Sequence, residues 1–214
     1  MMERRGCRRL ALIVAVALIA AATSGCGSGS TTTTVVRQAT AQPQPTTVHI
    51  YAPFSSSGAP VLPTARTVTG YCWTTSNATA RTDAWRCMTG NDILDPCFAA
   101  SRVAHFVLCP DGGPWSGKVV RMNLSRALPT LEATSPEPSP TTEPAWAVEL
   151  ADGGRCQLLL GAGNVTANLR ENYNCTNGVT LYGTASHSTQ PWTIFGRHGT
   201  TGQLMPQSVA AVWY

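Results

Sequence analysis

Six cysteines constrain the fold of this chain more than any other feature of its sequence. All six lie between Thr67 and Tyr214, at Cys72, Cys87, Cys97, Cys109, Cys156 and Cys175. An even set of cysteines in an exported chain implies disulfides rather than free thiols. Zinc is disfavoured, because no two of these cysteines have the C-x(2–4)-C spacing of a zinc site and no histidine pair follows at ligand spacing. We therefore expect no metal and no cofactor.

Among the many possible pairings of the six cysteines, we favour bridges between neighbours in the sequence. These are Cys72–Cys87, Cys97–Cys109 and Cys156–Cys175, each of which closes a short loop that contains turn-forming residues. In the chain-entropy account, a bridge that closes a loop of about 15 residues contributes roughly 3 kcal/mol. Three such bridges rival the net stability of an ordinary domain, about 5–15 kcal/mol.

The longest interruption of the cysteine-bearing region is the segment Glu132–Pro144, which has four prolines in thirteen residues. Proline is incompatible with a helix interior and with a central strand, so this segment is predicted to be an exposed loop. It divides residues 67–214 into two parts that would each bury little surface alone. We therefore predict one domain, 67–214, with a long internal loop at 132–144; two small modules are the alternative.

The remaining sequence favours a mainly β fold, a small antiparallel sheet domain stapled by disulfides. In the second half, "AWAVEL" and "RCQLLL" flank the turn "ADGG", "GVTLYG" is a short strand, and "PWTIFGR" and "SVAAVWY" are suited to a last hairpin. In the first half, "VAHFVLC" is predicted to be a strand. One short helix through "AWRCM", capped by Thr82 and Asp83, would make the fold α+β instead.

The amino-terminal 25 residues have the pattern of an export signal. Four arginines precede the thirteen uncharged residues from Leu10 to Ala22, which is too short for a comfortable membrane span. Thr23-Ser24-Gly25 directly before Cys26 resembles the lipobox of bacterial lipoproteins, although that family usually has leucine at the position of Thr23. The resemblance implies that residues 1–25 are removed and that Cys26 becomes the acylated first residue. Two or more acyl chains make a stable anchor.

Removal of this signal changes the charge balance. The full chain has 15 basic and 11 acidic residues, but 11 basic and 10 acidic residues remain after Cys26, a net charge of +1. No basic patch is left that would indicate a nucleic-acid partner. Residues 26–66 are rich in Ser, Thr, Pro, Gln and Gly and are predicted to be a disordered tether. Within it, "VHIYAPF" at 48–54 is the one stretch suited to an edge strand.

Residues with catalytic potential are few and are not arranged in a known motif. No nucleophile elbow, HExxH sequence or phosphate-binding loop occurs in 67–214. Asp92 and Asp95 are the nearest approach to a pair of catalytic carboxylates, and His105 lies in an apolar strand; for all three, a structural role is the better interpretation. Of the six tryptophans, Trp115 in "GGPWSG" is the best candidate for an exposed ligand contact, whereas the others suit a compact core.

The pattern "GYCW…DAWRCM…NDILDPCF", with the later "RC…NC" pair and the closing "PWTIF…VWY", resembles secreted or lipid-anchored proteins of actinobacteria that lack an assigned activity. This resemblance implies an envelope location and a disulfide domain, and it carries over no catalytic residue. We therefore expect a non-enzymatic lipoprotein on the extracytoplasmic face of the cell membrane. Its expected partners are the membrane, through the lipid, and a wall glycan or another envelope protein. The alternative is a hydrolase or transferase of the cell wall that uses Asp92, Asp95 or His105.

The lipobox-like sequence predicts that Cys26→Ala abolishes acylation. The wild-type protein should sediment with membranes, whereas the variant should lose that association and change its gel mobility, because the thioether-linked acyl group requires the cysteine sulfur. Cell fractionation with immunoblotting measures both properties. A variant that stays wholly in the membrane pellet with unchanged mobility contradicts the assignment.

Overall fold

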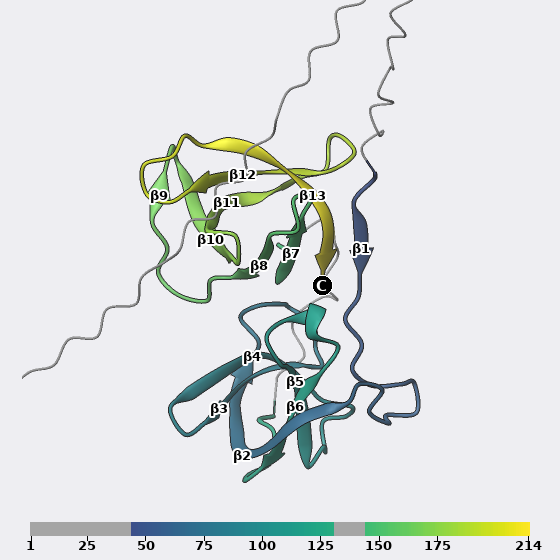
Figure 1. Ribbon diagram of the computed structural model, residues 1–214. Coiled ribbons are helices and arrows are strands. Elements are labelled where there is room, and N and C mark those ends of the chain that lie inside the picture. Colours follow the sequence, from purple (N-terminus) through teal and green to yellow (C-terminus); the bar gives the residue numbers. More distant parts are fainter. Residues whose placement is uncertain (1–43, 131–143) are drawn as a thin grey trace, which may run out of the picture. The chain divides into compact units, whose positions relative to one another are not determined.

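The computed structural model describes residues 44–130 and 144–214, which belong to one compact unit, Ala41–Tyr214 (Figure 1). The predicted export signal, Cys26 and nearly all of the proline-rich segment 132–144 lie outside the described residues. The described chain is almost entirely β, and its one helical element is a short 3₁₀ turn, η1 (Pro114–Ser116). The predicted fold class, a mainly β domain with antiparallel pairing and disulfides, is confirmed.

Five strands in the first half form a closed barrel: β2 (Thr64–Thr75), β3 (Ala84–Thr89), β4 (Asp92–Phe98), β5 (Phe106–Pro110) and β6 (Val119–Leu124). Each strand pairs antiparallel with the next, and the first and last, β2 and β6, pair in parallel to close the circle. The interior contains its own cluster of buried side chains, among them Trp85, Val107 and Met122. We call this part the barrel.

The second half forms a sheet that we call the C-terminal sheet. Its strands are β7 (Ala147–Leu150), β8 (Arg155–Leu158), β9 (Val165–Thr166), β10 (Leu169–Cys175), β11 (Val179–Ser186), β12 (Thr193–His198) and β13 (Met205–Trp213). The pairing follows the order β13-β12-β11-β10-β8-β7, and β13 also pairs with β7, so the path of paired strands returns to its start. Its core contains residues such as Tyr173, Leu181 and Ile194. The hairpins predicted around "ADGG" and at the end of the chain are both present.

The three disulfides connect neighbouring cysteines, as predicted. Each bridge joins residues that face each other on adjacent antiparallel strands: Cys72 is opposite Cys87, and Cys156 is opposite Cys175. Cys97 and Cys109 flank the pair Phe98–Leu108 and are joined in the same way. Because a shift of one residue turns every side chain to the other face of a strand, each bridge fixes the register of its strand pair.

The helix predicted through Ala84–Met88 is wrong, because this segment is strand β3. Its buried residues alternate with partly exposed ones: Trp85 and Cys87 are buried, whereas Arg86 and Met88 are not. That period of two fits a strand with one face on the barrel core. The bridge from Cys87 to Cys72 holds the segment in that alignment and overrides its helical propensity.

The predicted tether 26–66 is too long at its carboxyl end, because the fold includes the described residues from Thr46 onward. Strand β1 (Thr47–His49) pairs in parallel with the last residues of β13. The Thr46 hydroxyl donates a hydrogen bond to the carbonyl of Val209 at 2.7 Å and accepts one from the amide of Trp192 at 2.7 Å. On this edge, β12 pairs only with the first residues of β13. The backbone groups of the last residues of β13 would otherwise be unpaired there, and β1 pairs with them.

An aromatic cluster and one arginine join the barrel to the C-terminal sheet. The ring centroid of Tyr51 lies 5.3 Å from that of Phe98 in β4 and 5.5 Å from that of Trp146 beside β7. The Arg81 guanidinium lies 4.6 Å from the Phe98 centroid and forms an ion pair with Asp83 at 2.7 Å. Its Nη1 also donates hydrogen bonds to the backbone oxygens of Tyr51 and Tyr214.

This arrangement predicts how the protein responds to a single cut between its halves. A recognition sequence for a specific protease is inserted between Pro138 and Ser139, and the cut protein is analysed by size exclusion. The two fragments should elute together in buffer, because β1 and the aromatic cluster hold them, and should separate in denaturant without reductant.

An uncut control in the same buffers reports any effect of the insertion itself. If the cut fragments separate only after a reductant is added, a bridge crosses the insertion and the pairing of cysteines is wrong. If they separate in plain buffer, the contacts around Tyr51 are too weak to join the halves.

Candidate functional site

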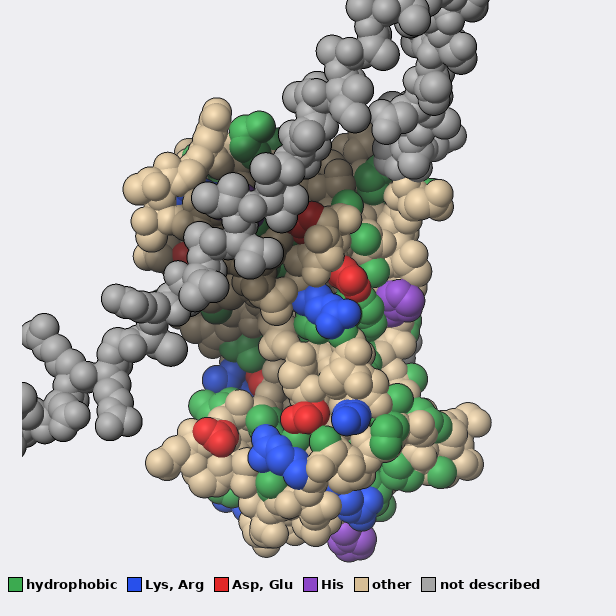
Figure 2. Space-filling model, viewed as in Figure 1, with side chains coloured by type: hydrophobic (Ala, Val, Ile, Leu, Met, Phe, Trp, Pro, Cys, Tyr) green, Lys and Arg blue, Asp and Glu red, His purple; other side chains and the backbone are tan. Residues whose placement is uncertain are grey.

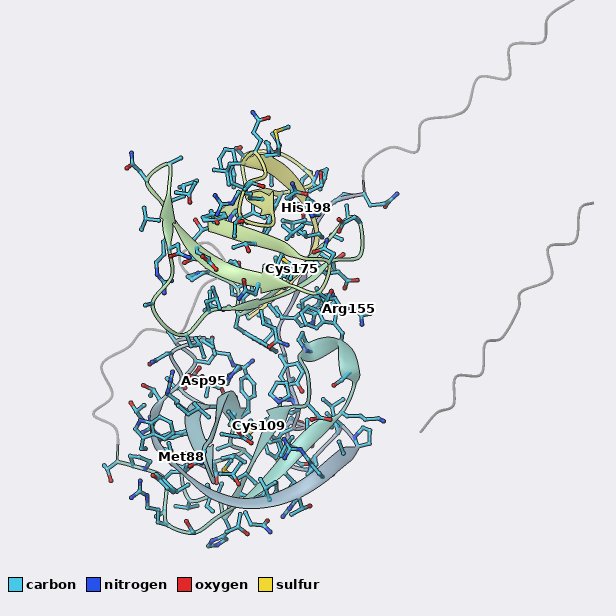
Figure 3. All side chains as sticks on the ribbon, turned by 60° about the vertical axis from the view of Figure 1, so that its left-hand side comes forward. Met88, Asp95, Cys109, Arg155, Cys175 and His198 are labelled. Carbon is cyan, nitrogen blue, oxygen red and sulfur yellow. A yellow bond between two sulfur atoms is a disulfide. The ribbon has the colours of Figure 1, made fainter. Side chains whose placement is uncertain are left out.

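The candidate site is a groove between the η1 turn and the outer face of β8 and β10. It has a volume of about 560 Å³ and is lined by residues that include Trp115, Arg155, Gln157, Leu158, Asn174 and Thr176. A smaller cavity of about 210 Å³ adjoins it, because both are lined by Gly112, Gln157 and Leu158. We call the two together the Trp115 groove. Figure 3 shows Arg155 beside the η1 turn, and Asp95 on the barrel.

The loop "DGGPWSG" sets the position of Trp115 through its backbone. Gly113 has a φ of 100°, a conformation that residues with a Cβ rarely adopt. A Cβ at Gly113 would lie 2.5 Å from the Trp115 ring and 2.8 Å from Nε2 of Gln157. The Ser116 hydroxyl donates a hydrogen bond to the Gly113 carbonyl at 3.2 Å and closes the turn. Only glycine at 113 lets the indole approach the backbone this closely.

Trp115 is half-buried, so the expectation that it is exposed is wrong. The edge of its indole meets Trp213 of β13, with ring centroids 5.4 Å apart and planes at 72°. The guanidinium of Arg155 lies 5.8 Å from the Trp115 centroid. The glycine-rich sequence indicates an exposed loop. It gives no sign of the contact with Trp213, which lies almost one hundred residues further along the chain and packs against the indole of Trp115.

The polar side of the groove comes from the outer faces of β8 and β10. In β8, Arg155 and Gln157 are exposed and Cys156 between them is buried, as period two requires. Gln157 stands directly opposite Asn174 of β10. The bridge from Cys156 to Cys175 holds this register, so it also holds the two amide side chains side by side. A primary amide offers both donors and an acceptor, and two of them suit a ligand that has both.

Two buried donors of the groove make no hydrogen bond within the described residues, Nε1 of Trp115 and Nε1 of Trp146. Trp146 lines the smaller cavity and is only 3% exposed. A buried donor without an acceptor costs about 1–3 kcal/mol.

The three residues considered for catalysis do not come together. Asp95 lines the smaller cavity of the Trp115 groove, whereas His105 is exposed and lines a different cavity. Asp92 is exposed at the start of β4 and lines neither of these cavities. Glycoside hydrolysis uses two carboxyl groups held across one cleft, and Asp92 and Asp95 do not share one.

Asp95 holds the loop between β2 and β3 in place. It accepts hydrogen bonds from the Ser76 hydroxyl and from the Asn77 amide at 3.1 Å, and Arg86 Nη1 lies 3.2 Å from its second oxygen. Its side chain is 1% exposed. Burial raises the pKa of the Asp95 carboxyl, and this effect outweighs the hydrogen bonds and the Arg86 charge, which lower it.

Within the described residues, no group of three or more His, Cys, Asp or Glu side chains is placed to hold a metal ion. No helix in the same part of the chain is long and apolar enough to cross a membrane. Comparison with protein-family models, curated proteins and solved structures yields no match to this chain. The geometry of the Trp115 groove is therefore the basis for assigning a function.

The raised pKa of Asp95 predicts how stability depends on pH. The folded state binds this proton more tightly than the unfolded chain does, so Asp95 contributes most stability below its ordinary value of 3.8. That contribution is lost as pH rises through the raised pKa of the folded state. Denaturant titrations from pH 3 to 7 should show this loss in the wild type but not in Asp95→Asn.

Asp92→Asn is the matched control, because Asp92 is an exposed carboxylate of the same strand. It should keep the wild-type dependence of the unfolding free energy on pH. An Asp95→Asn variant with the same pH dependence as the wild type would show that burial does not dominate the titration of this group.

Proposed function

We propose that this chain is a lipid-anchored protein of the cell envelope whose folded part binds wall glycan in the Trp115 groove and performs no reaction of its own. The lipobox-like sequence before Cys26 supports the location. The observation that carries the binding role is the meeting of one indole with two opposed amide side chains in a single groove.

The chemistry of the groove fits an uncharged, acetamido-bearing sugar. A pyranose ring has an apolar face that an indole covers well, and its hydroxyls require donors and acceptors at the rim. Gln157 and Asn174 supply both kinds of group. The amide of an N-acetyl substituent is a planar donor and acceptor and matches the same two side chains. A volume of about 560 Å³ is in the usual range for a small-molecule site.

No specific contact favours the alternative, a hydrolase or transferase of the cell wall. Asp95 has its oxygens engaged by Ser76, Asn77 and Arg86. His105 lines a different cavity from Asp95, and Asp92 lines neither of the two cavities. A binding role requires only the groove.

The test is calorimetric titration with an N-acetylglucosamine tetramer, with maltotetraose as the sugar that lacks the acetamide. The wild-type protein should bind the first and discriminate against the second. Trp115→Ala should weaken binding about tenfold, because aromatic anchors dominate such contacts. Gln157→Ala should weaken it as well, and its exposed position leaves the fold intact.

Trp73→Ala is the matched control, because Trp73 is another half-buried tryptophan but lies in β2 and lines neither cavity of the groove. It should bind the tetramer as the wild type does. Equal binding by the wild type and Gln157→Ala, or no binding of the tetramer at all, contradicts the assignment of glycan to this groove.

A further inference from the structure

A third cavity lies at the other end of the hairpin formed by β5 and β6. The Trp115 groove adjoins the loop that leaves β5 and enters β6, whereas this cavity lies where β5 begins and β6 ends. Its volume is about 690 Å³, and its lining includes Arg102, Val103, His105, Leu124, Arg126 and Leu128. We call it the cationic cavity.

The rim of the cationic cavity has basic side chains and no acidic one. Arg102, His105 and Arg126 are all exposed, and no Asp or Glu is among the described residues that line it. Neither Arg102 nor Arg126 takes part in an ion pair within the described residues. The arginines that do so are Arg66, Arg81 and Arg86. The guanidinium charges at this rim are therefore available to an anion.

Part of this rim is already positioned by contacts of the barrel. The guanidinium of Arg126 lies 3.9 Å from the centroid of the Tyr71 ring, which holds the charge against the barrel wall. The amide of Leu124 donates a hydrogen bond to the carbonyl of His105 at 2.9 Å and ties the two strand ends together. Less side-chain freedom is then lost when a ligand binds.

The floor of the cavity is apolar. Ala104 and Leu124 pack against the core of the barrel, and Leu128 is 8% exposed. Val103 stands at the rim with 84% of its surface exposed, the highest value among the large hydrophobic side chains that are exposed. An apolar floor beneath a cationic rim matches a ligand that has an apolar chain and an anionic head.

The distribution of charge along the chain also favours an anionic ligand for the barrel. Residues 64–130, which include the barrel, contain seven Lys or Arg and four Asp, whereas residues 144–214 contain three Arg and three Asp or Glu. Among the described residues, the excess of positive over negative side chains therefore lies in the part that includes the barrel. Figure 2 shows the blue side chains of Lys and Arg gathered mostly over this lower part of the view. A positive field of this kind attracts anions before contact.

We propose that the cationic cavity binds a single lipid with an anionic head group, its acyl chain on the floor of Leu124 and Leu128 and its head group against Arg102 and Arg126. The site does not require acylation of Cys26 or glycan in the Trp115 groove. It is a second binding site, formed by residues that the first does not use.

The test uses the chain from residue 27 onward, which retains the whole compact unit and has no acyl group of its own. The probe is dodecyl phosphate at concentrations below micelle formation, followed by calorimetry. Dodecyl phosphocholine and inorganic phosphate separate the roles of charge and chain. We expect dodecyl phosphate to bind at least tenfold more tightly than either of the others, in line with a charge-assisted contact and a buried chain.

Arg102→Gln should weaken the binding of dodecyl phosphate about tenfold, since it removes one charge-assisted contact. Arg102 is exposed and makes no ion pair within the described residues, so this change leaves the fold intact. Lys118→Gln is the matched control: it removes one exposed charge of the same barrel from outside the cavity and should change binding less than twofold.

Four results would overturn the proposal. Inorganic phosphate that binds as tightly as dodecyl phosphate would make this a site for a free anion. Equal binding of dodecyl phosphocholine would show that the rim charge does not select the ligand. An Arg102→Gln variant with wild-type affinity, or binding to anionic vesicles without binding of the monomeric probe, would rule out a single-lipid site in this cavity.

Discussion

The bridges between directly opposed cysteines are the constraint on which the rest of this structure depends. A small β domain with many glycines has little core to specify how its strands align, and a slip of one residue would exchange its two faces. Cys156–Cys175 illustrates the consequence: it keeps Cys156 inward and thereby keeps Arg155 and Gln157 on the outer face of β8. The candidate binding groove is a product of that register.

The second constraint acts between the barrel and the C-terminal sheet. No bridge connects them, so their association depends on packing around Tyr51 and on Arg81. Arg81 lies over the ring of Phe98 in the barrel and donates hydrogen bonds to the backbone oxygens of Tyr51, after β1, and of Tyr214, after β13. A guanidinium suits this role because its donors lie in one plane and its face stacks on a ring. The half-buried indole of Trp115 depends on the same association, since Trp213 belongs to the sheet.

Local signals in the sequence were sufficient for local structure. The hairpin around "ADGG" and the bridges between neighbouring cysteines involve residues close in the chain, and both were predicted. The segment Ala84–Met88 is a strand although Thr82 and Asp83 are suited to cap a helix, because its alternating burial fits the wall of the barrel. Residues 46–66 have the composition of a tether, and only 48–54 has the pattern of an edge strand. The edge that β1 covers belongs to β13, far away in the sequence, and no local pattern indicates it.

The groove and the cationic cavity were beyond sequence reasoning for the same reason. Arg102 and Arg126 are separated by a strand, a loop and a second strand, and the antiparallel pairing of β5 with β6 brings them to one rim. The pairing of Gln157 with Asn174 follows from the predicted bridge Cys156–Cys175 in the antiparallel ladder, but the approach of η1 to these two side chains does not. The sequence shows which residue types are present, whereas the strand topology determines which of them line one cavity.

The hairpin of β5 and β6 gives these two sites a defined relation. One lies at its loop and the other at its open end, so the length of the strands separates them; five residues of strand span about 17 Å. A lipid held at the open end of the barrel would place that end at the membrane surface, and the loop with Trp115 would then point away from the bilayer. A glycan site with that orientation would face the wall, as the proposed function requires. The two proposals are independent in their chemistry, but the strands that join them make them compatible in space.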